Sequence, residues 1–154
     1  MKQRIYIDTS VIGGYFDEEF CEATILLFQR LENCEVIFVV SDLLDIELIN
    51  APEKVRNLLH QYSKDNFERV ELTEDAEKLA NTYIAEKVVG KTSLEDCRHI
   101  AMATINKVDV LASWNFKHIV NLDRIKGYNA VNLKFGYAMI EIRSPKDLVN
   151  YNNE

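Results

Sequence analysis

Three carboxylates in the sequence stand in apolar surroundings, where a lone negative charge is unfavourable. Asp8 ends a run of β-branched and aromatic residues, Glu47 lies among leucines and isoleucines, and Asp96 precedes a stretch of small and apolar residues. Like charges brought together raise each other's pKa, so three such side chains favour a bound cation. Mg²⁺ or Mn²⁺ would suit them, because hard cations prefer oxygen ligands. An ion held in this way can activate water for in-line displacement at phosphorus, which makes all three side chains candidate metal ligands.

Each carboxylate also has a structural explanation. Asp8 could cap the helix that follows it, since Asp is a good N-cap residue. Asp96 stands three residues after Ser93, which is capping-box spacing, and the helix dipole favours an acid there. Glu47 shares a helix face with leucines and would need a cationic partner. The residues alone leave these alternatives open.

Other catalytic chemistries find little support in the sequence. The three cysteines form no Cys-x-x-Cys pair and no zinc-like group with the three histidines, so reduced, mostly buried thiols are expected. The residues concerned are Cys21, Cys34, Cys97, His60, His99 and His118. His99 follows Asp96 by one helical turn and could orient a carboxylate, although packing at the edge of the core is the better interpretation. There is no candidate Ser-His-Asp triad, glycine-rich phosphate loop or His-Glu-x-x-His motif.

Short β-branched and aromatic runs alternate with longer segments of helical periodicity. Strands are expected at residues 5–7, 36–40, 67–72, 109–112 and 138–142, and helices near 23–31, 42–50, 52–64, 73–89, 94–105 and after Pro145. This alternation predicts an α/β fold, a three-layer α/β/α sandwich with a mainly parallel central sheet. The carboxyl ends of parallel strands share one edge of a sheet. Asp8, the helix start at Ser41 or Asp42, and the segment 113–115 are therefore expected to converge.

Length and composition indicate one globular domain spanning residues 1–154. Hydrophobic residues make up 47% of the chain and charged residues 28%, with no run long enough to span a membrane. The apolar stretch near the N-terminus is too short for a signal peptide, so an intracellular, cytoplasmic protein is expected. The net charge of −7 argues against tight non-specific nucleic-acid binding. Any contact with nucleic acid must then come from a local patch.

The segment that follows the fourth expected strand holds the best candidates for such a patch. Trp114 and Phe116 could stack a base, although anchoring of the loop is the better interpretation. The most cationic run follows closely and could face phosphate or simply water. It consists of Lys117, His118, Arg124 and Lys126.

The order and spacing of four motifs resemble those of the PIN domain family, and within it the VapC-like toxins of bacterial toxin–antitoxin pairs. The motifs are Ile5-Tyr6-Ile7-Asp8-Thr9-Ser10-Val11, Ser41-x5-Glu47-Leu48, Asp96-x2-His99-Ile100-Ala101-x-Ala103 and Asp109-x-Leu111-x2-Trp114-Asn115-Phe116-x-His118. The resemblance covers nearly the whole chain. It implies a metal-dependent endoribonuclease, a protein antitoxin as partner, and a homodimer.

The same resemblance assigns roles to four residues. Asp8, Glu47 and Asp96 match the first three acids of the family's acidic quartet, while Asn115 stands where the fourth acid is commonly Asp. Asn115 brings no charge but could ligate through its carbonyl oxygen or a water, so weaker binding of a second metal is expected. Ser10 or Ser113 could add a neutral oxygen near the site or act as a cap.

The sequence therefore predicts a Mg²⁺- or Mn²⁺-dependent endoribonuclease that hydrolyses RNA with a metal-activated water. The alternative is a catalytically weak or inactive PIN-like module that binds RNA or a protein partner. A phosphotransferase of the haloacid dehalogenase type is disfavoured, because it needs a second acid two residues after Asp8, where the chain has Ser10.

Overall fold

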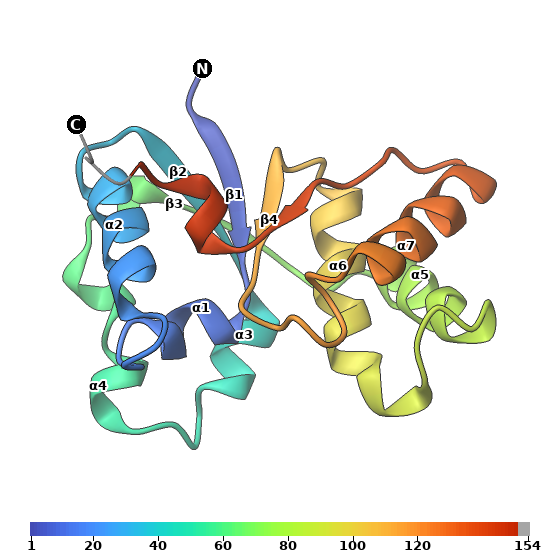
Figure 1. Ribbon diagram of the computed structural model, residues 1–154, viewed down its shortest axis with the longest axis horizontal. Helices are drawn as coiled ribbons and strands as arrows, with labels where there is room; N and C mark the ends of the chain where they lie inside the picture. Colours follow the sequence, from blue (N-terminus) through green and yellow to red (C-terminus); the bar gives the residue numbers. More distant parts are fainter. Residues whose placement is uncertain (151–154) are drawn as a thin grey trace.

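The computed structural model describes residues 1–150 and is built around one five-stranded sheet (Figure 1). The strands lie in the order β3-β2-β1-β4-β5, and every neighbouring pair is parallel. Their bounds are β1 Gln3–Ile7, β2 Val36–Ser41, β3 Phe67–Val70, β4 Val110–Ala112 and β5 Ile142–Arg143. The mainly parallel sheet predicted from the sequence is confirmed. Residues 151–154 of the expected 1–154 domain lie outside the described range.

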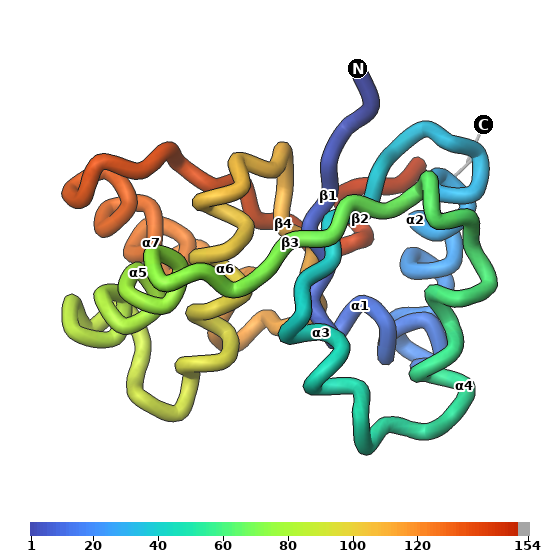
Figure 2. Tube along the Cα trace, turned by 180° about the vertical axis from the view of Figure 1, so that it is seen from behind, coloured from blue at the N-terminus to red at the C-terminus, as the bar shows by residue number. Residues whose placement is uncertain are grey.

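Helices cover both faces of the sheet, which confirms the three-layer α/β/α fold (Figures 1 and 2). On one side lie α1 (Thr9–Gly14), α2 (Cys21–Glu32) and α4 (Glu53–Arg56). On the other side lie α5 (Glu74–Ala85), α6 (Leu94–Ile105) and α7 (Leu122–Lys134). The short α3 (Asp42–Glu47) directly follows β2 at the carboxyl end of the sheet.

The central strand β1 joins two apolar cores, because successive side chains of a strand point to opposite faces. Ile5 and Ile7 pack with α1 and α2, whereas Tyr6 packs with α5, α6 and α7. All three side chains are completely buried. Tyr6 therefore carries its hydroxyl group into the layer that contains α6.

Several elements are shorter than predicted, among them α4 and β5. The helix expected to run to residue 64 ends at Arg56, and two 3₁₀ turns follow it, since none of the four residues of α4 is buried. The last strand begins at Ile142 instead of residue 138. The backbone of Ile140 bonds to the Asn129 side chain of α7 and not to the sheet, with Ile140 N donating to Oδ1 at 2.8 Å and Nδ2 donating to Ile140 O at 3.0 Å.

Composition-based expectations about thiols and membrane segments can also be compared with the structure. All three cysteines are free. Cys97 is buried and Cys21 is half-buried, as expected, but Cys34 is exposed, so the prediction of buried thiols is wrong for that residue. Within residues 1–150, no helix combines the length and apolar character needed to cross a membrane.

Candidate active site

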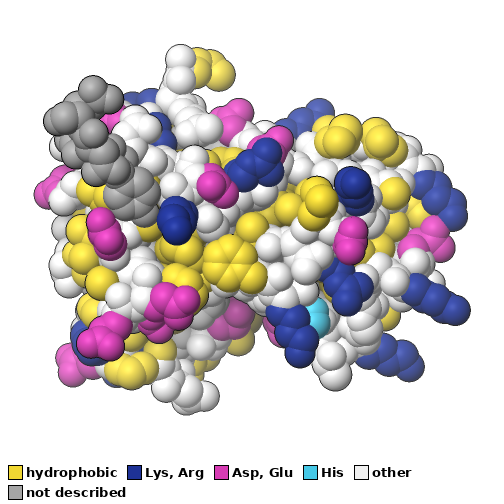
Figure 3. Space-filling view, in the orientation of Figure 1, with side chains coloured by type: hydrophobic (Ala, Val, Ile, Leu, Met, Phe, Trp, Pro, Cys, Tyr) yellow, Lys and Arg dark blue, Asp and Glu magenta, His cyan; other side chains and the backbone are white. Residues whose placement is uncertain are grey.

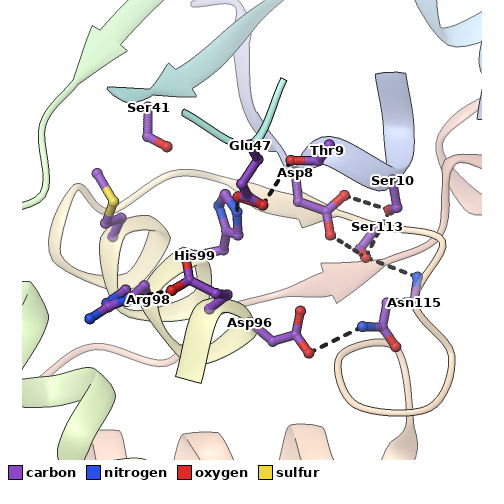
Figure 4. Close-up of polar contacts among 12 residues, drawn as sticks. Asp8, Thr9, Ser10, Ser41, Glu47, Asp96, Arg98, His99, Ser113 and Asn115 are labelled. Atoms are coloured by element: carbon purple, nitrogen blue, oxygen red, sulfur yellow. Dashed lines mark hydrogen bonds and ion pairs between the residues drawn. The ribbon is translucent and has the colours of Figure 1, made fainter. Parts of the chain in front are cut away.

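Asp8 lies at the carboxyl end of β1 and is 4% exposed (Figure 4). It occupies the N-cap position of α1 but makes no side-chain capping bond, so the capping explanation is wrong. Its two oxygens instead accept hydrogen bonds from Ser10 Oγ at 2.5 Å and Ser113 Oγ at 2.6 Å. Burial raises the pKa of Asp8, and the charge of His99 and the two hydroxyl groups offset this only in part.

Asp96 lies in the first turn of α6 and turns toward the segment after β4 (Figure 4). Ser93 makes no side-chain capping bond, so the expected capping box does not form. Asp96 Oδ2 accepts a hydrogen bond from Asn115 Nδ2 at 3.3 Å. Burial raises the pKa of Asp96, and the negative charge of Asp8 raises it further. The two carboxylates therefore lie close enough to repel each other.

Asn115 makes hydrogen bonds to Ser113, which contacts Asp8, and to Asp96. Its backbone N–H donates to Ser113 Oγ at 3.0 Å, while Oδ1 accepts from the backbone N–H groups of Lys117 at 3.2 Å and His118 at 3.0 Å. Because those two groups require an acceptor, the amide orientation is fixed and Nδ2 must face Asp96. In this structure Asn115 therefore acts on Asp96 as a hydrogen-bond donor.

Glu47, at the end of α3, is paired with the buried His99 of α6 (Figure 4). Glu47 Oε1 lies 2.5 Å from His99 Nε2, and Oε2 accepts from Thr9 Oγ1 at 3.0 Å. The other imidazole nitrogen lies 2.6 Å from the Tyr6 hydroxyl, which donates to Ser41 Oγ at 3.0 Å. Both imidazole nitrogens therefore have a polar partner, and a protonated ring would donate a hydrogen bond to each of them.

The pKa shifts of Glu47 and His99 favour an ionised carboxylate paired with a protonated imidazole. Burial alone would raise the pKa of Glu47, but the hydrogen bond and charge of His99 hold it below its ordinary value. Burial would lower the pKa of His99, but the bond and charge of Glu47 raise it above the ordinary 6.5. The cationic partner that Glu47 was predicted to need is thus His99, which orients a carboxylate rather than merely packing at the edge of the core.

The chemistry of the acids suits a hard divalent cation. Asp8 and Asp96 present carboxylate oxygens, the atoms that a hard cation prefers, and burial raises the pKa of both. The charge of Glu47 is compensated by His99. Within the described part of the chain, no group of three or more His, Cys, Asp or Glu side chains is arranged to hold a metal ion. The ligand set Asp8, Glu47 and Asp96 stays a prediction.

Several residues of the site were not singled out by the sequence, or were left with two interpretations. Ser113 is completely buried and bonds to Asp8, which shows that the ends of β1 and β4 meet. Ser10 bonds to Asp8 and to Trp114 N, so both serines orient the site instead of capping a helix. Thr9 and Tyr6 had no signal beyond their place in the first motif, because their partners lie far away along the chain.

The cationic run after Asn115 does not form a single patch. Arg124 Nη1 bonds to the carbonyl oxygen of Val88, which ties α7 to the segment after α5. Lys117 is exposed, whereas His118 is half-buried and its Nδ1 is the one buried side-chain N or O atom without a partner within residues 1–150. The charge of His118 lowers the pKa of Asp96, so this side chain acts on the site itself.

Trp114 anchors the segment after β4, as the sequence favoured. The indole is 8% exposed, its Nε1 donates to Thr24 Oγ1 at 2.9 Å, and its ring stacks on Phe20 with centroids 4.3 Å apart. Phe116, two residues later, is 49% exposed. The two aromatic residues therefore differ in role, and only Phe116 presents its ring to solvent.

Replacing Gly14 by Ala is expected to disturb this anchor. A Cβ atom at Gly14 would lie 2.6 Å from Trp114 Nε1 and 3.0 Å from Thr24 Oγ1, so the indole would have to move. Overpacking of this kind lowers the free energy of unfolding by about 1–3 kcal/mol. Denaturant unfolding would measure the loss. The matched Gly13→Ala change, with nothing within 4 Å of the new Cβ, should be neutral or stabilising; equal stability of the two variants would contradict the argument.

Known proteins similar to this chain are found by comparing structures but not by comparing sequences. No family sequence model matches the chain, and no curated protein matches it in sequence. Among solved structures, the DNA-bound VapBC of Salmonella typhimurium is 16% identical, covers 94% of this chain and 99% of its own, and has a TM-score of 0.57. FitAcB from Neisseria gonorrhoeae is 16% identical, with coverage of 92% and 97% and a TM-score of 0.56.

A third similar structure is VapC20 of Mycobacterium tuberculosis, a sarcin-ricin loop cleaving toxin. It is 12% identical, covers 73% of this chain and 91% of its own, and has a TM-score of 0.55. At these identities the similarity concerns the arrangement of the strands and helices. The chain therefore has the PIN-like fold of VapC-type toxin–antitoxin proteins, as the resemblance in sequence predicted.

Proposed function

We propose that this chain is a Mg²⁺- or Mn²⁺-dependent endoribonuclease, the toxin of a toxin–antitoxin pair. The observation that carries the proposal is the pair Asp8 and Asp96, a buried and a half-buried carboxylate near the carboxyl edge of the sheet, both with raised pKa values. A fold alone is compatible with many functions, whereas a repelling pair of acids at such an edge favours cation chemistry. Similarity to VapC20, whose description names it as a cleaving toxin, supports RNA as the substrate.

The side chains of this chain would position the reaction. Asp8 and Asp96 would hold the ion, Ser10 and Ser113 fix the orientation of the Asp8 carboxylate, and Asn115 fixes that of Asp96. A bound Mg²⁺ or Mn²⁺ would supply activation of a water molecule and stabilisation of charge on the phosphate. Glu47, held by His99 Nε2 and Thr9 Oγ1, would add a third carboxylate near the ion, with its charge balanced by His99.

The proposal includes the partners expected from the sequence. A cognate antitoxin protein is supported by the similar structures, which include a toxin–antitoxin complex from Klebsiella pneumoniae, 17% identical with a TM-score of 0.53, coverage of 73% of this chain and 88% of its own. A homodimer, a single domain over residues 1–154 and a place in the cytoplasm complete the proposal.

A second function is favoured by one specific observation. Asn115 brings no charge, and its Oδ1 is already bonded to two backbone N–H groups, which leaves this position without a free carboxylate. On this view the chain is a catalytically weak or inactive PIN-like module that binds RNA or a protein partner. Calorimetric titration with Mn²⁺ separates the two candidates: neither heat nor cleavage across a set of RNAs would favour the binding module.

Cleavage of single-stranded RNA is expected to require added metal. A fluorescently labelled RNA should be cut in Mg²⁺ or Mn²⁺, remain intact in excess EDTA, and be cut again when Mn²⁺ is restored, because the bound metal would activate the attacking water. The Asp96→Asn variant should be inactive under all three conditions. The exposed Asp75 of α5 offers a matched control, and Asp75→Asn should behave as the parent protein does. Equal cleavage in EDTA and Mn²⁺ would exclude the proposed chemistry.

A further inference from the structure

A small cavity with aromatic walls lies beside the candidate active site. Its volume is about 270 Å³, and its lining includes Phe20, Trp114 and Phe116. Phe20 and Trp114 are stacked, while the Phe116 ring stands at a steep angle to Trp114, with centroids 6.0 Å apart. Phe116 also lies 6.3 Å from the Phe20 ring. Phe116 leaves about half of its ring in water although it stands beside two other aromatic rings, so the ring offers apolar surface that a bound molecule could cover.

The cavity is connected to the carboxylates by a few bonds. The backbone N–H of Trp114 donates a hydrogen bond to Ser10 Oγ at 2.8 Å, and Ser10 Oγ in turn donates to Asp8 Oδ1 at 2.5 Å. Asn115, between the two aromatic residues, bonds to Asp96. Along residues 114–116 the side chains thus alternate between the cavity and the acids. A molecule in the cavity would therefore lie next to whatever the acids act on.

The charged side chains that line the cavity indicate which kind of molecule could bind in it. The lining holds two carboxylates, Glu19 and Glu22, and one ammonium group, Lys146, so its net charge is negative. Figure 3 shows hydrophobic side chains reaching the surface in the middle of this face, with acidic and basic side chains around them. A phosphate group or an acidic peptide is disfavoured inside such a lining. A neutral flat ring that carries amino groups fits it, because carboxylates accept hydrogen bonds from exocyclic amines.

We propose that this cavity binds one unpaired base of an RNA strand, stacked on Phe116, with the Lys146 ammonium beside the adjoining phosphate. The volume lies near the lower limit of about 300 Å³ for small-ligand sites, which suits a single ring system. Stacking on aromatic side chains is the general means of holding unpaired bases. Glu19 and Glu22 favour adenine, guanine and cytosine, which carry amino groups, over uracil. The inference rests on the proposed function and adds a base-recognition site to it.

The intrinsic fluorescence of Trp114 offers a direct binding signal, because Trp114 is the one tryptophan of the chain and forms a wall of the cavity. The full chain in EDTA would be titrated with a short oligoadenylate, an oligouridylate and an abasic oligonucleotide of equal length. Saturable quenching is expected with oligoadenylate, weaker quenching with oligouridylate, and none with the abasic strand. EDTA prevents cleavage, so the measurement does not depend on catalysis.

Substitution of the exposed ring tests the stacking contact. Phe116→Ala is expected to weaken oligoadenylate binding about 5- to 150-fold, which corresponds to the ~1–3 kcal/mol that base–aromatic stacking contributes. Phe116→Tyr, which keeps the ring, should bind as the parent does. Phe135, 50% exposed at the C-cap of α7 and outside the cavity lining, provides a matched control, and Phe135→Ala should leave binding unchanged. Circular dichroism of each variant would show that the fold is retained.

Three outcomes would overturn the base-binding proposal. Equal quenching by the abasic strand would show that only the backbone binds, and quenching by a Phe- or Leu-containing peptide but by no oligonucleotide would assign the cavity to a protein partner. Unchanged binding in a folded Phe116→Ala variant would exclude the stacking contact. Base binding without any metal-dependent cleavage would overturn the proposed nuclease and leave the base-binding proposal standing. Cleavage without base binding would overturn the base-binding proposal and leave the proposed nuclease standing.

Discussion

The Asp8→Asn variant is expected to lose RNA cleavage and, in the absence of metal, to unfold at a higher temperature than the parent protein. The loss of activity should exceed about 100-fold, which is the upper range for residues that merely orient a metal ligand. The gain in stability follows from burial, which raises the pKa of Asp8 and makes its ionised form unfavourable in the folded protein. Asn keeps the size of the side chain and can still accept from one serine hydroxyl while donating to the other.

The effect of Asp8 on stability should depend on pH in a defined direction. A folded pKa above the ordinary 3.8 means that the unfolded chain ionises first as pH rises, so ionisation of Asp8 favours unfolding. Parent and variant should therefore unfold at similar temperatures below about pH 4. Above that pH the unfolding temperature of Asp8→Asn should exceed that of the parent, by roughly 2–4 °C for each kcal/mol by which ionised Asp8 destabilises the folded parent.

Thermal unfolding in EDTA between pH 4 and 8 would measure this difference. The exposed Asp75 again gives the control, because Asp75→Asn removes the same charge from a solvated position. A lower unfolding temperature for Asp8→Asn across the whole pH range would show that the Asp8 carboxylate stabilises the fold. That result would argue for a structural role and against a site that awaits a cation.

Removal of His99 is expected to give the largest loss of stability. His99 is 2% exposed and bonds to both Glu47 and Tyr6, so His99→Ala leaves a partly buried carboxylate without its cation and opens a cavity. Breaking a buried pair on one side costs about 3–5 kcal/mol. Because the Glu47 side chain is still 26% exposed, we expect a loss of unfolding free energy at the lower end of this range, about 3 kcal/mol. His60, exposed on the opposite layer, gives the control variant His60→Ala.

The contribution of the His99 pair should decline at alkaline pH. The folded pKa of His99 lies above the ordinary 6.5, so the stabilisation is complete below that pH and is lost as pH rises through the folded value. Denaturant unfolding at pH 6 and pH 9 would measure it. A double-mutant cycle with Glu47→Gln isolates the pair, since His99→Ala should be less harmful in that background. Strictly additive losses would mean that the two side chains are not coupled.

The central part of the fold could be predicted because its signals are local. The β-branched and aromatic runs that became β1 and β2, and the rule that parallel strands end at one edge, together brought Asp8 and the segment 113–115 to the right place. The weak β5 and the short α4 could not be predicted in the same way. Their lengths depend on whether a tertiary partner, such as Asn129 for Ile140, satisfies the backbone first.

The details of the site depend on contacts between distant parts of the chain. The pairing of Glu47 with His99 joins residues 52 apart, and that of Tyr6 with His99 joins residues 93 apart. Spacing alone showed that Glu47 needed a cation but could not show which one. The orientation of Asn115 likewise follows from the two backbone N–H groups that its oxygen accepts, which depends on a turn that no local pattern specified.

The bond between Asp8 and Ser113 also has a consequence for how the protein is synthesised. These residues are 105 positions apart, and β1 cannot pair with β4 until the second of them has been made. A growing chain thus carries Asp8 early but lacks Ser113 and Asn115, so the candidate site can be assembled only after β4 and the residues that follow it have been synthesised.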